Sequence, residues 1–326
     1  MTGLTIESLR AISIQANREL ANAQRKLEHA QQYHRSAMQK ANTARQAYEE
    51  AQDAADTTYK PVVVPAGFTS QLNVVYTKVN GWEGKVDLYL PPFSTKASPV
   101  IINIHGGGWK NGVKESQTGF STFFKAGFAV ANLEYRLTGQ ATAPAAIEDV
   151  RCALIYLIKN AAALHIDVNR IIIMGGSAGG HLALMGGLLG NDHRFDTNCS
   201  GVEGIKVAAI IDKYGITDVW DWAYGKNITS KSATQWLGDK AKDEAFAAAV
   251  SPLTYVTKNS PPVLIIHGDA DPTVPYQHSV DLYNKLRSVG VVTEFITVPG
   301  GLHGKFDKEK NAEINNAIVQ FVSKLK

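Results

Sequence analysis

The sequence predicts an α/β fold, in which a mostly parallel sheet carries helices on both faces, preceded by a long helical segment. From Val100 onward, short apolar runs alternate with segments of helical periodicity, and this alternation is typical of parallel sheets. Residues 8–56, in contrast, contain neither proline nor glycine, which favours helix.

The first predicted element is a coiled-coil-like helical arm within residues 1–57. One series of small residues at seven-residue intervals consists of Ala16, Ala23, Ala30, Ala37, Ala44 and Ala51. A second series consists of Leu20, Leu27, His34, Ala41, Tyr48 and Ala55. We expect this heptad seam to form a close antiparallel hairpin or to mediate self-association. The arm is interpreted as having no part in the chemistry, and the alternative is a module that binds substrate or a cell surface.

Residues 58–326 are expected to form the α/β domain. Residues 59–65 predict an extended linker, because Pro61 and Pro65 stop any helix. The segments 72–79 and 85–90 predict a hairpin at the edge of the sheet. Further strands are predicted at 99–104, 128–133, 170–174, 206–214, 262–266 and 291–298, and helices at 145–160, 178–190 and 276–289.

The alternation breaks between Asp218 and Ser251, which indicates an insertion at about residues 219–250. The insertion holds three of the five tryptophans. As a group its aromatic residues favour a cap or cleft wall, since aromatic faces bind sugars and planar acyl groups. The candidates for substrate binding are Trp220, Trp222 and Tyr224. For each ring alone, the alternative is packing of the insertion onto the body.

The motif that points most directly to chemistry is Gly175-Gly176-Ser177-Ala178-Gly179, directly after an apolar run. A G-x-S-x-G pattern between a strand and a helix is typical of a nucleophile elbow. Glycines are needed around the serine because side chains there would strike the neighbouring strand or helix. Ser177 is therefore the candidate nucleophile.

A second motif, His105-Gly106-Gly107-Gly108-Trp109, follows the strand predicted at 99–104. Three glycines leave backbone N–H groups able to stabilise an oxyanion. We expect the hole to consist of the N–H groups of Gly107, Gly108 and Ala178, with His105 and Trp109 bracing the loop. A phosphate-binding loop is the rival interpretation, but neither a Walker nor a dinucleotide spacing follows.

The strands predicted at 262–266 and 291–298 lead into HGDADPTVP at 267–275 and PGGLHG at 299–304, respectively. The order Ser, Asp, His, each on a loop after a strand, is that of an α/β-hydrolase triad. Together, HGGGW, GGSAGG, SPLTYV and HGDADPTVP resemble the HGGG-type esterase and lipase branch of that superfamily, and most of all bacterial feruloyl/acetyl carbohydrate esterases. The likeness covers about residues 60–326.

The resemblance implies an α/β-hydrolase fold, with Ser177 as nucleophile, His303 as general base and Asp271 as the acid that orients it. Asp269 is the competitor for the acid, and the pattern HG-x-x-D-x-x-V favours Asp271. Asp218 is expected to make structural hydrogen bonds. The remaining histidines are assigned structural positions, among them His267 at the end of a strand.

Composition sets further limits. A formal net charge of +3 with mixed signs leaves no basic stripe for nucleic acid, and no apolar run approaches the roughly 18 residues of a membrane span. Residues 1–8 show no signal-peptide pattern, although the esterases that the chain resembles commonly act outside the cytoplasm. Cys152 and Cys199 leave both pairing and compartment open. No zinc motif is present, and we expect neither metal nor cofactor.

The sequence therefore predicts a serine carboxylic-ester hydrolase acting through an acyl-enzyme on feruloyl or acetyl esters of plant polysaccharides or oligosaccharides. A general short-chain carboxylesterase, a formamidase or a peptidase on the same fold are the enzyme alternatives, because a fold does not choose among them. The alternative of another class is an inactive hydrolase-like binding protein.

Overall fold

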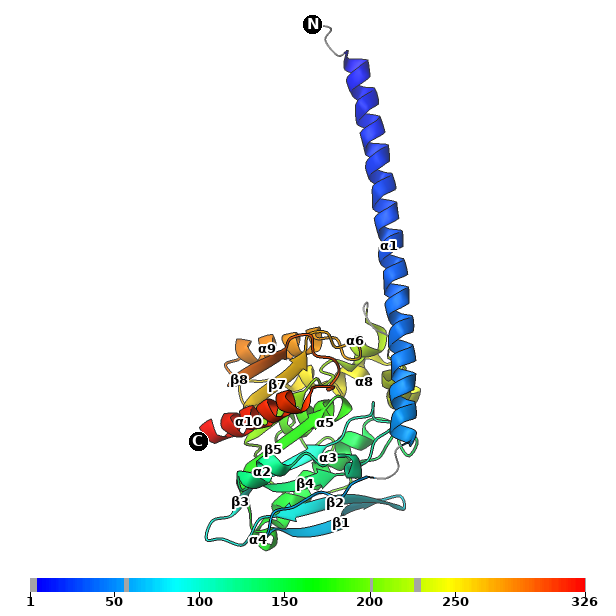
Figure 1. Cartoon of the computed structure of the whole chain (residues 1–326). Coiled ribbons are helices and arrows are strands. Elements are labelled where there is room, and N and C mark those ends of the chain that lie inside the picture. The colour runs from blue at the N-terminus through cyan, green and yellow to red at the C-terminus, as the bar shows by residue number, and fades with distance from the viewer. Residues whose placement is uncertain (1–4, 56–58, 200–201, 226–229, 326) are drawn as a thin grey trace. The chain divides into compact units, whose positions relative to one another are not determined.

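The computed structural model describes residues 5–55, 59–199, 202–225 and 230–325. The chain divides into two compact units, Met1–Gln52 and Asp53–Lys326, which are drawn in Figure 1. The second unit, called the body below, carries the sheet.

Helix α1 (Ile6–Ala55) forms most of the first unit and runs without a break for 50 residues. The predicted helix is therefore confirmed, but the antiparallel hairpin is wrong for the described residues. A hairpin needs a turn, and no proline or glycine interrupts residues 8–56. Several large apolar side chains of α1 are exposed, namely Ile6, Ile12, Ile14, Leu20, Leu27 and Tyr33.

The body is built on an eight-stranded sheet with the order β1-β2-β4-β3-β5-β6-β7-β8. Its strands are β1 (Thr69–Val79), β2 (Trp82–Leu90), β3 (Ser98–Ile104), β4 (Ala129–Leu133), β5 (Ile166–Gly176), β6 (Ala209–Lys213), β7 (Val263–Gly268) and β8 (Thr293–Val298). The hairpin β1–β2 joins the sheet by antiparallel pairing of β2 with β4. The pairs from β4 to β8 are parallel. The predicted sheet and its edge hairpin are confirmed.

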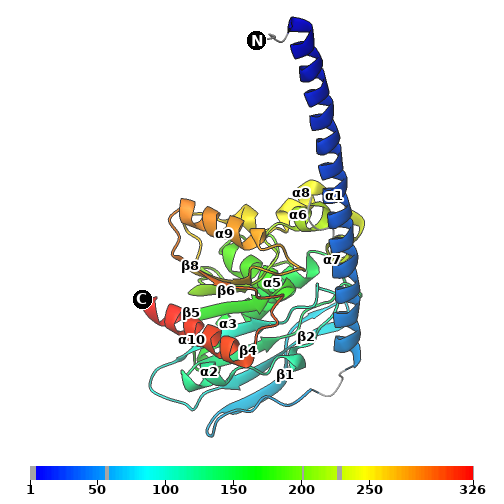
Figure 2. The same ribbon diagram turned by 45° about the horizontal axis from the view of Figure 1, so that its top comes forward.

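Helices cover both faces of the sheet (Figures 1 and 2). One core includes Ile102 of β3 with residues of α3 (Ala145–Lys159), α5 (Ala178–Leu188) and α9 (Gln277–Ser288). The other core includes Ile101 with residues of α2 (Ser121–Lys125) and α10 (Lys308–Lys324). Neighbouring residues of a strand point to opposite faces, so β3 is buried on both. The sequence interpretation missed α10, whose polar outer face gives it little apolar signal, and the short helices α2 and α4 (Ala161–Leu164).

The expected insertion between β6 and β7 is helical. It contains α6 (Val219–Tyr224), α7 (Lys231–Leu237) and α8 (Glu244–Ala249). Asp218 caps α6, because its side chain accepts a hydrogen bond from Asp221 N at 3.0 Å. This is the structural role expected for Asp218.

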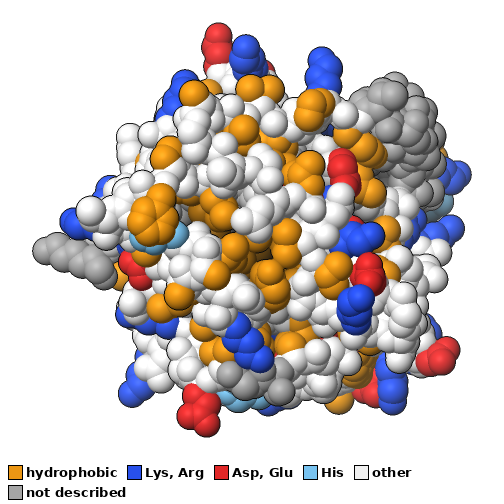
Figure 3. Space-filling model, turned by 90° about the horizontal axis from the view of Figure 1, so that it is seen from below, with side chains coloured by type: hydrophobic (Ala, Val, Ile, Leu, Met, Phe, Trp, Pro, Cys, Tyr) orange, Lys and Arg blue, Asp and Glu red, His pale blue; other side chains and the backbone are white. Residues whose placement is uncertain are grey.

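Figure 3 shows one face of the molecule. Hydrophobic side chains gather around a hollow near the centre of this face, and charged side chains lie mostly toward its edge. Basic and acidic side chains are interspersed there. No single sign of charge dominates this face.

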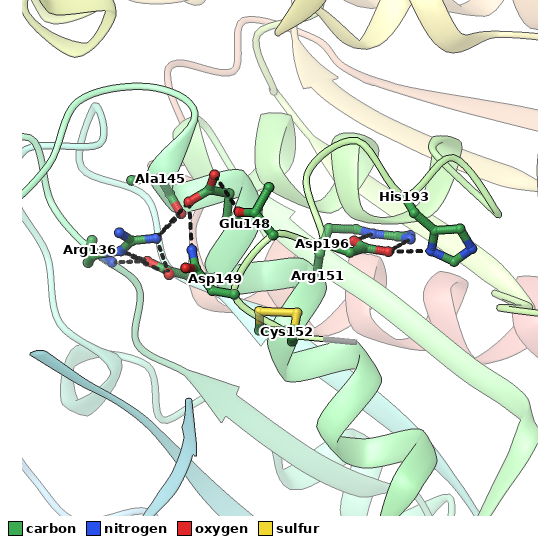
Figure 4. Close-up of a disulfide and its surroundings, with 11 residues drawn as sticks. Arg136, Ala145, Glu148, Asp149, Arg151, Cys152, His193 and Asp196 are labelled. Carbon is green, nitrogen blue, oxygen red and sulfur yellow. Dashed lines mark hydrogen bonds and ion pairs between the residues drawn. A yellow bond between two sulfur atoms is a disulfide. The ribbon is translucent and has the colours of Figure 1, made fainter. Parts of the chain in front are cut away.

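A disulfide and a buried ion pair tie α3 to the loop that follows α5, and a second ion-pair cluster ties α3 to the segment after β4 (Figure 4). Cys152 and Cys199 are bonded, with their Cα atoms 5.4 Å apart. Beside them the buried Arg151 donates to both carboxylate oxygens of Asp196, at 2.7 and 2.8 Å. Arg136 pairs with Asp149 and Glu148 on α3. The loop after α5 is therefore held to α3 by one covalent bond and by the buried ion pair of Arg151 with Asp196.

Replacement of both cysteines, by Cys152→Ala and Cys199→Ala, is expected to lower the free energy of unfolding by about 2–4 kcal/mol, because the unfolded chain loses a cross-link. Denaturant unfolding followed by circular dichroism measures this change. Reduced wild-type protein is the control and should match the double variant. Equal midpoints for the oxidised wild type and the variant would contradict the bracing role.

Candidate active site

Ser177 lies between the end of β5 and the first residue of α5 in an uncommon backbone conformation. Its φ is 58° and its ψ is −125°, a region that residues other than glycine rarely adopt. Its N–H donates to Lys213 O at the end of β6, at 2.9 Å. A strained turn of this kind lifts the serine side chain out of the sheet.

The glycines of the elbow allow three segments to meet at close range. A Cβ on Gly175 would lie 2.1 Å from Gly179 O, and a Cβ on Gly179 would lie 2.3 Å from Ile104 O at the end of β3. Both distances are far below any tolerated contact. Only glycine fits at these two positions, as the motif predicts.

The serine hydroxyl lies at one end of a hydrogen-bonded series. Ser177 Oγ lies 2.8 Å from His303 Nε2. On the other side of the ring, His303 Nδ1 lies 2.6 Å from Asp271 Oδ2. With the proton on Nδ1, the ring donates to the carboxylate and its Nε2 accepts the serine hydroxyl proton. This is the arrangement in which a serine becomes a nucleophile.

Asp271 is buried and its carboxylate is fully hydrogen-bonded. Its Oδ1 accepts hydrogen bonds from Thr273 N at 2.7 Å and Val274 N at 3.0 Å. Burial by itself raises the pKa of Asp271, but hydrogen bonds from His267 and His303 outweigh it and hold the pKa well below its usual value. The carboxylate therefore stays ionised and can stabilise a charged imidazole.

Asp269, the competitor, occupies a different position. Its Oδ1 accepts a hydrogen bond from Gly300 N at 2.6 Å. Asp269 thus fixes the loop that leads to His303, while Asp271 contacts the imidazole itself.

The glycine loop after β3 lies directly against the elbow. A Cβ on Gly106 would lie 2.9 Å from Gly176 O and 3.4 Å from Ser177 Cβ. Gly107 and Gly108 have φ values of 106° and 59°, which glycine adopts without strain. His105 contacts Gly106 O through Nδ1 at 2.8 Å and stacks on Tyr135, so it braces the loop as expected.

Trp109 connects this loop to the insertion. Its ring is fully buried, stacks on Trp236 of α7 at 4.2 Å and meets the edge of Trp222 of α6 at 5.5 Å. Its Nε1 donates to His181 Nδ1 on α5 at 3.2 Å, and His181 Nε2 donates to Val250 O at 2.8 Å. The insertion therefore holds the glycine loop against α5.

The structure differs from the sequence interpretation at Trp222. This ring is only 2% exposed, and its Nε1 donates to Thr273 O at 2.9 Å. Its place is the core, because the insertion packs it between Trp109 and the loop that carries Asp271. Tyr224 donates its hydroxyl to Ala241 O at 2.6 Å. Trp220 packs on Tyr224 and is partly exposed.

Two residues near the triad were not singled out from the sequence. His267 Nε2 lies 3.0 Å from Asp271 Oδ2. The Tyr214 ring lies 4.8 Å from the His303 ring and has a φ of 43°. The sequence signal that could have identified them is their position, because both residues stand at the carboxyl ends of strands that lead to the site.

Within the residues that the structure describes, no group of three or more His, Cys, Asp or Glu side chains is arranged to hold a metal ion. None of the helices in those residues has the length and apolarity needed to cross a bilayer.

Comparison with known proteins identifies the family of this chain. The model of the BD-FAE family matches residues 86–286, more than half of the chain. Esterase LipC of Mycobacterium tuberculosis is 28% identical over 71% of this chain and 59% of its own length. The chain thus spans less than two thirds of that curated relative.

Two solved structures are also similar. One is described as a truncated form of a carbohydrate esterase from gut microbiota, at 30% identity and a TM-score of 0.66, with 82% of this chain and 98% of that chain covered. The other is a bifunctional GH43-CE protein of Bacteroides eggerthii, at 28% identity and a TM-score of 0.69, with 78% and 35% covered.

The geometry predicts separate consequences for the two aspartates. Asp271→Asn is expected to lower kcat on the order of 10⁴-fold, because the imidazole loses its orienting acid, and Asp269→Asn much less. Ser177→Ala or His303→Ala should lower kcat by several orders of magnitude in a folded protein. Steady-state hydrolysis of an aryl acetate measures these effects, with circular dichroism as the control for folding. Equal losses at both aspartates would contradict the assignment.

Proposed function

The chain belongs to the BD-FAE family, and we propose that it is a serine-dependent carboxylic-ester hydrolase. The observation that carries this proposal is the series from the Ser177 hydroxyl through His303 to the buried Asp271 carboxylate. The glycine loop lies against the same serine, at the position where a negatively charged oxygen would form.

In the proposed reaction, His303 Nε2 takes the hydroxyl proton while Ser177 Oγ attacks the ester carbonyl. The oxygen of the tetrahedral intermediate accepts hydrogen bonds from the N–H groups of Gly107, Gly108 and Ala178. His303 then protonates the departing alcohol, which leaves an acyl group on the serine. Water attacks this acyl-enzyme with His303 again as base, and the acid and the free serine are released.

For the substrate we propose acetyl or feruloyl esters of plant polysaccharides or oligosaccharides. Support comes from the likeness to the structures described as a carbohydrate esterase and a GH43-CE protein, and from the partly exposed Trp220 ring. A general short-chain carboxylesterase is the second candidate, favoured by the likeness to Esterase LipC. The Cys152–Cys199 disulfide supports action in an oxidising compartment, since cytosolic thiols are kept reduced.

We further propose that α1 mediates self-association. Leu20 and Leu27 belong to the second series of the heptad seam and are each 59% exposed, and Ile6, fourteen residues before Leu20, is 86% exposed. A second copy packed on this seam would remove these side chains from water. The alanine series of the seam, from Ala16 to Ala51, would let the two helix backbones approach closely.

The substrate proposal is tested with a methyl hydroxycinnamate and a small aryl acetate. Trp220→Ala is expected to lower kcat/KM for the larger ester by roughly three- to tenfold, because one aromatic contact is worth about 0.5–1.5 kcal/mol. The acetate should be less affected. A proportional loss on both esters would leave only the general esterase function.

Trp222→Ala is the matched control. Because this ring packs on Trp109 and bonds Thr273 O, its loss should lower kcat/KM for both esters alike. It should also lower the free energy of unfolding by about 3–5 kcal/mol. If the wild type hydrolyses neither ester and Ser177 resists a fluorophosphonate, the protein is an inactive hydrolase-like binding protein.

Deletion of residues 1–56 is expected to leave kcat/KM for the aryl acetate within about threefold, or about 0.65 kcal/mol, because the triad and both oxyanion segments lie in the body. Sedimentation velocity should show a self-associated species for the full chain and only the monomer for the truncated chain. A folded truncated protein without activity would show that α1 helps to build the site.

A further inference from the structure

His267, the fifth residue of β7, lies behind the triad acid. Side chains on a strand alternate between its faces, so His267 shares the face of Ile265, which α9 covers. Its side chain and that of Asp271 are both fully buried. His267 therefore meets the acid within the core of the body.

The protonation of His267 Nε2 follows from its neighbours. This nitrogen lies 3.0 Å from Asp271 Oδ2 and 3.2 Å from Val274 O. A carbonyl oxygen and an ionised carboxylate can only accept hydrogen bonds. Nε2 therefore carries the ring hydrogen and donates a hydrogen bond to Asp271 Oδ2.

The other ring nitrogen is anchored as well. His267 Nδ1 lies 2.7 Å from Ser279 Oγ in the first turn of α9, and Ser279 is fully buried. The series of hydrogen bonds thus runs from Ser279 through His267, Asp271 and His303 to Ser177. Other titratable groups around His267 are Tyr214 after β6, and Tyr276 and His278 beside and within α9.

We propose that His267 is a positioning residue for the hydrolytic reaction, because its Nε2–H holds Asp271 Oδ2 in place for His303. The inference rests on the proposed function. One carboxylate oxygen accepts from both imidazoles, and the other accepts from two backbone N–H groups. With four donors the buried carboxylate can neither rotate nor take up a proton without losing a hydrogen bond.

The test compares His267→Phe, His267→Gln and His267→Asn in the full-length protein. Phenylalanine keeps the ring and removes the donor. The longer glutamine side chain places an amide donor near the position of Nε2. The shorter asparagine reaches only the side of Nδ1 and Ser279.

We expect His267→Phe and His267→Asn to lower kcat roughly ten- to hundredfold, the size expected when a hydrogen bond to a buried charge is lost. KM should stay within threefold of the wild-type value, because no substrate contact is removed. Glutamine should restore most of kcat. The acid limb of the kcat/KM profile should move to higher pH in the Phe and Asn variants, since the carboxylate then binds the proton on His303 more strongly.

Ser279→Ala is the control for packing, because it removes only the far end of the series and should change kcat much less. Wild-type turnover and its loss in Ser177→Ala establish the proposed function independently. If those two results hold and the Phe, Asn and Gln variants all keep wild-type kcat and pH profile, the inference is overturned. Equal losses of kcat in His267→Gln and His267→Asn would also overturn the inference. If His267→Phe does not fold, the comparison of the Gln and Asn variants is the test.

Discussion

The strained backbone of Ser177 sets the geometry of the whole candidate site. Its positive φ is costly for a serine and persists only because its surroundings hold it. Those surroundings are backbone rather than side chains, since the flanking glycines bring the carbonyl of Gly179 and the end of β3 within contact distance. Any side chain at Gly175 or Gly179 would push these segments apart, and the glycine loop would leave the serine.

Sheet register brings the remaining parts to the same edge. Ile104 of β3 and Asp212 of β6 both pair with Gly175 of β5, so the loops that follow these strands begin side by side. Because the strands are parallel, their carboxyl ends meet where open α/β sheets bind ligands. β7 continues the same register beside β6 and delivers the loop with Asp271. Residues more than a hundred positions apart thereby form one hydrogen-bonded series.

The insertion has a mechanical relation to this site. Its tryptophans reach two loops of the candidate site at once, since Trp222 contacts both Trp109 and Thr273 O, and Trp236 stacks on Trp109. Large buried rings contribute much of the packing energy of a core. A segment that interrupts the alternation of the fold thus fixes the distance between the glycine loop and the acid loop. The buried Trp222 and Trp236 therefore brace these loops, whereas the partly exposed Trp220 stays a candidate for substrate contact.

Local patterns predicted the strands, the elbow and the order of the candidate triad, because apolar runs and glycine spacing are local properties of the chain. The sequence favoured Asp271 over Asp269 by motif alone. Only the folded chain shows that Trp222 lies in the core, that Cys152 is bonded to Cys199, and that His267 is hydrogen-bonded to Asp271. It also revealed α10, whose narrow apolar stripe has meaning only against the sheet. These features depend on which segments, far apart in the sequence, pack together in the fold. A local sequence pattern does not specify such contacts.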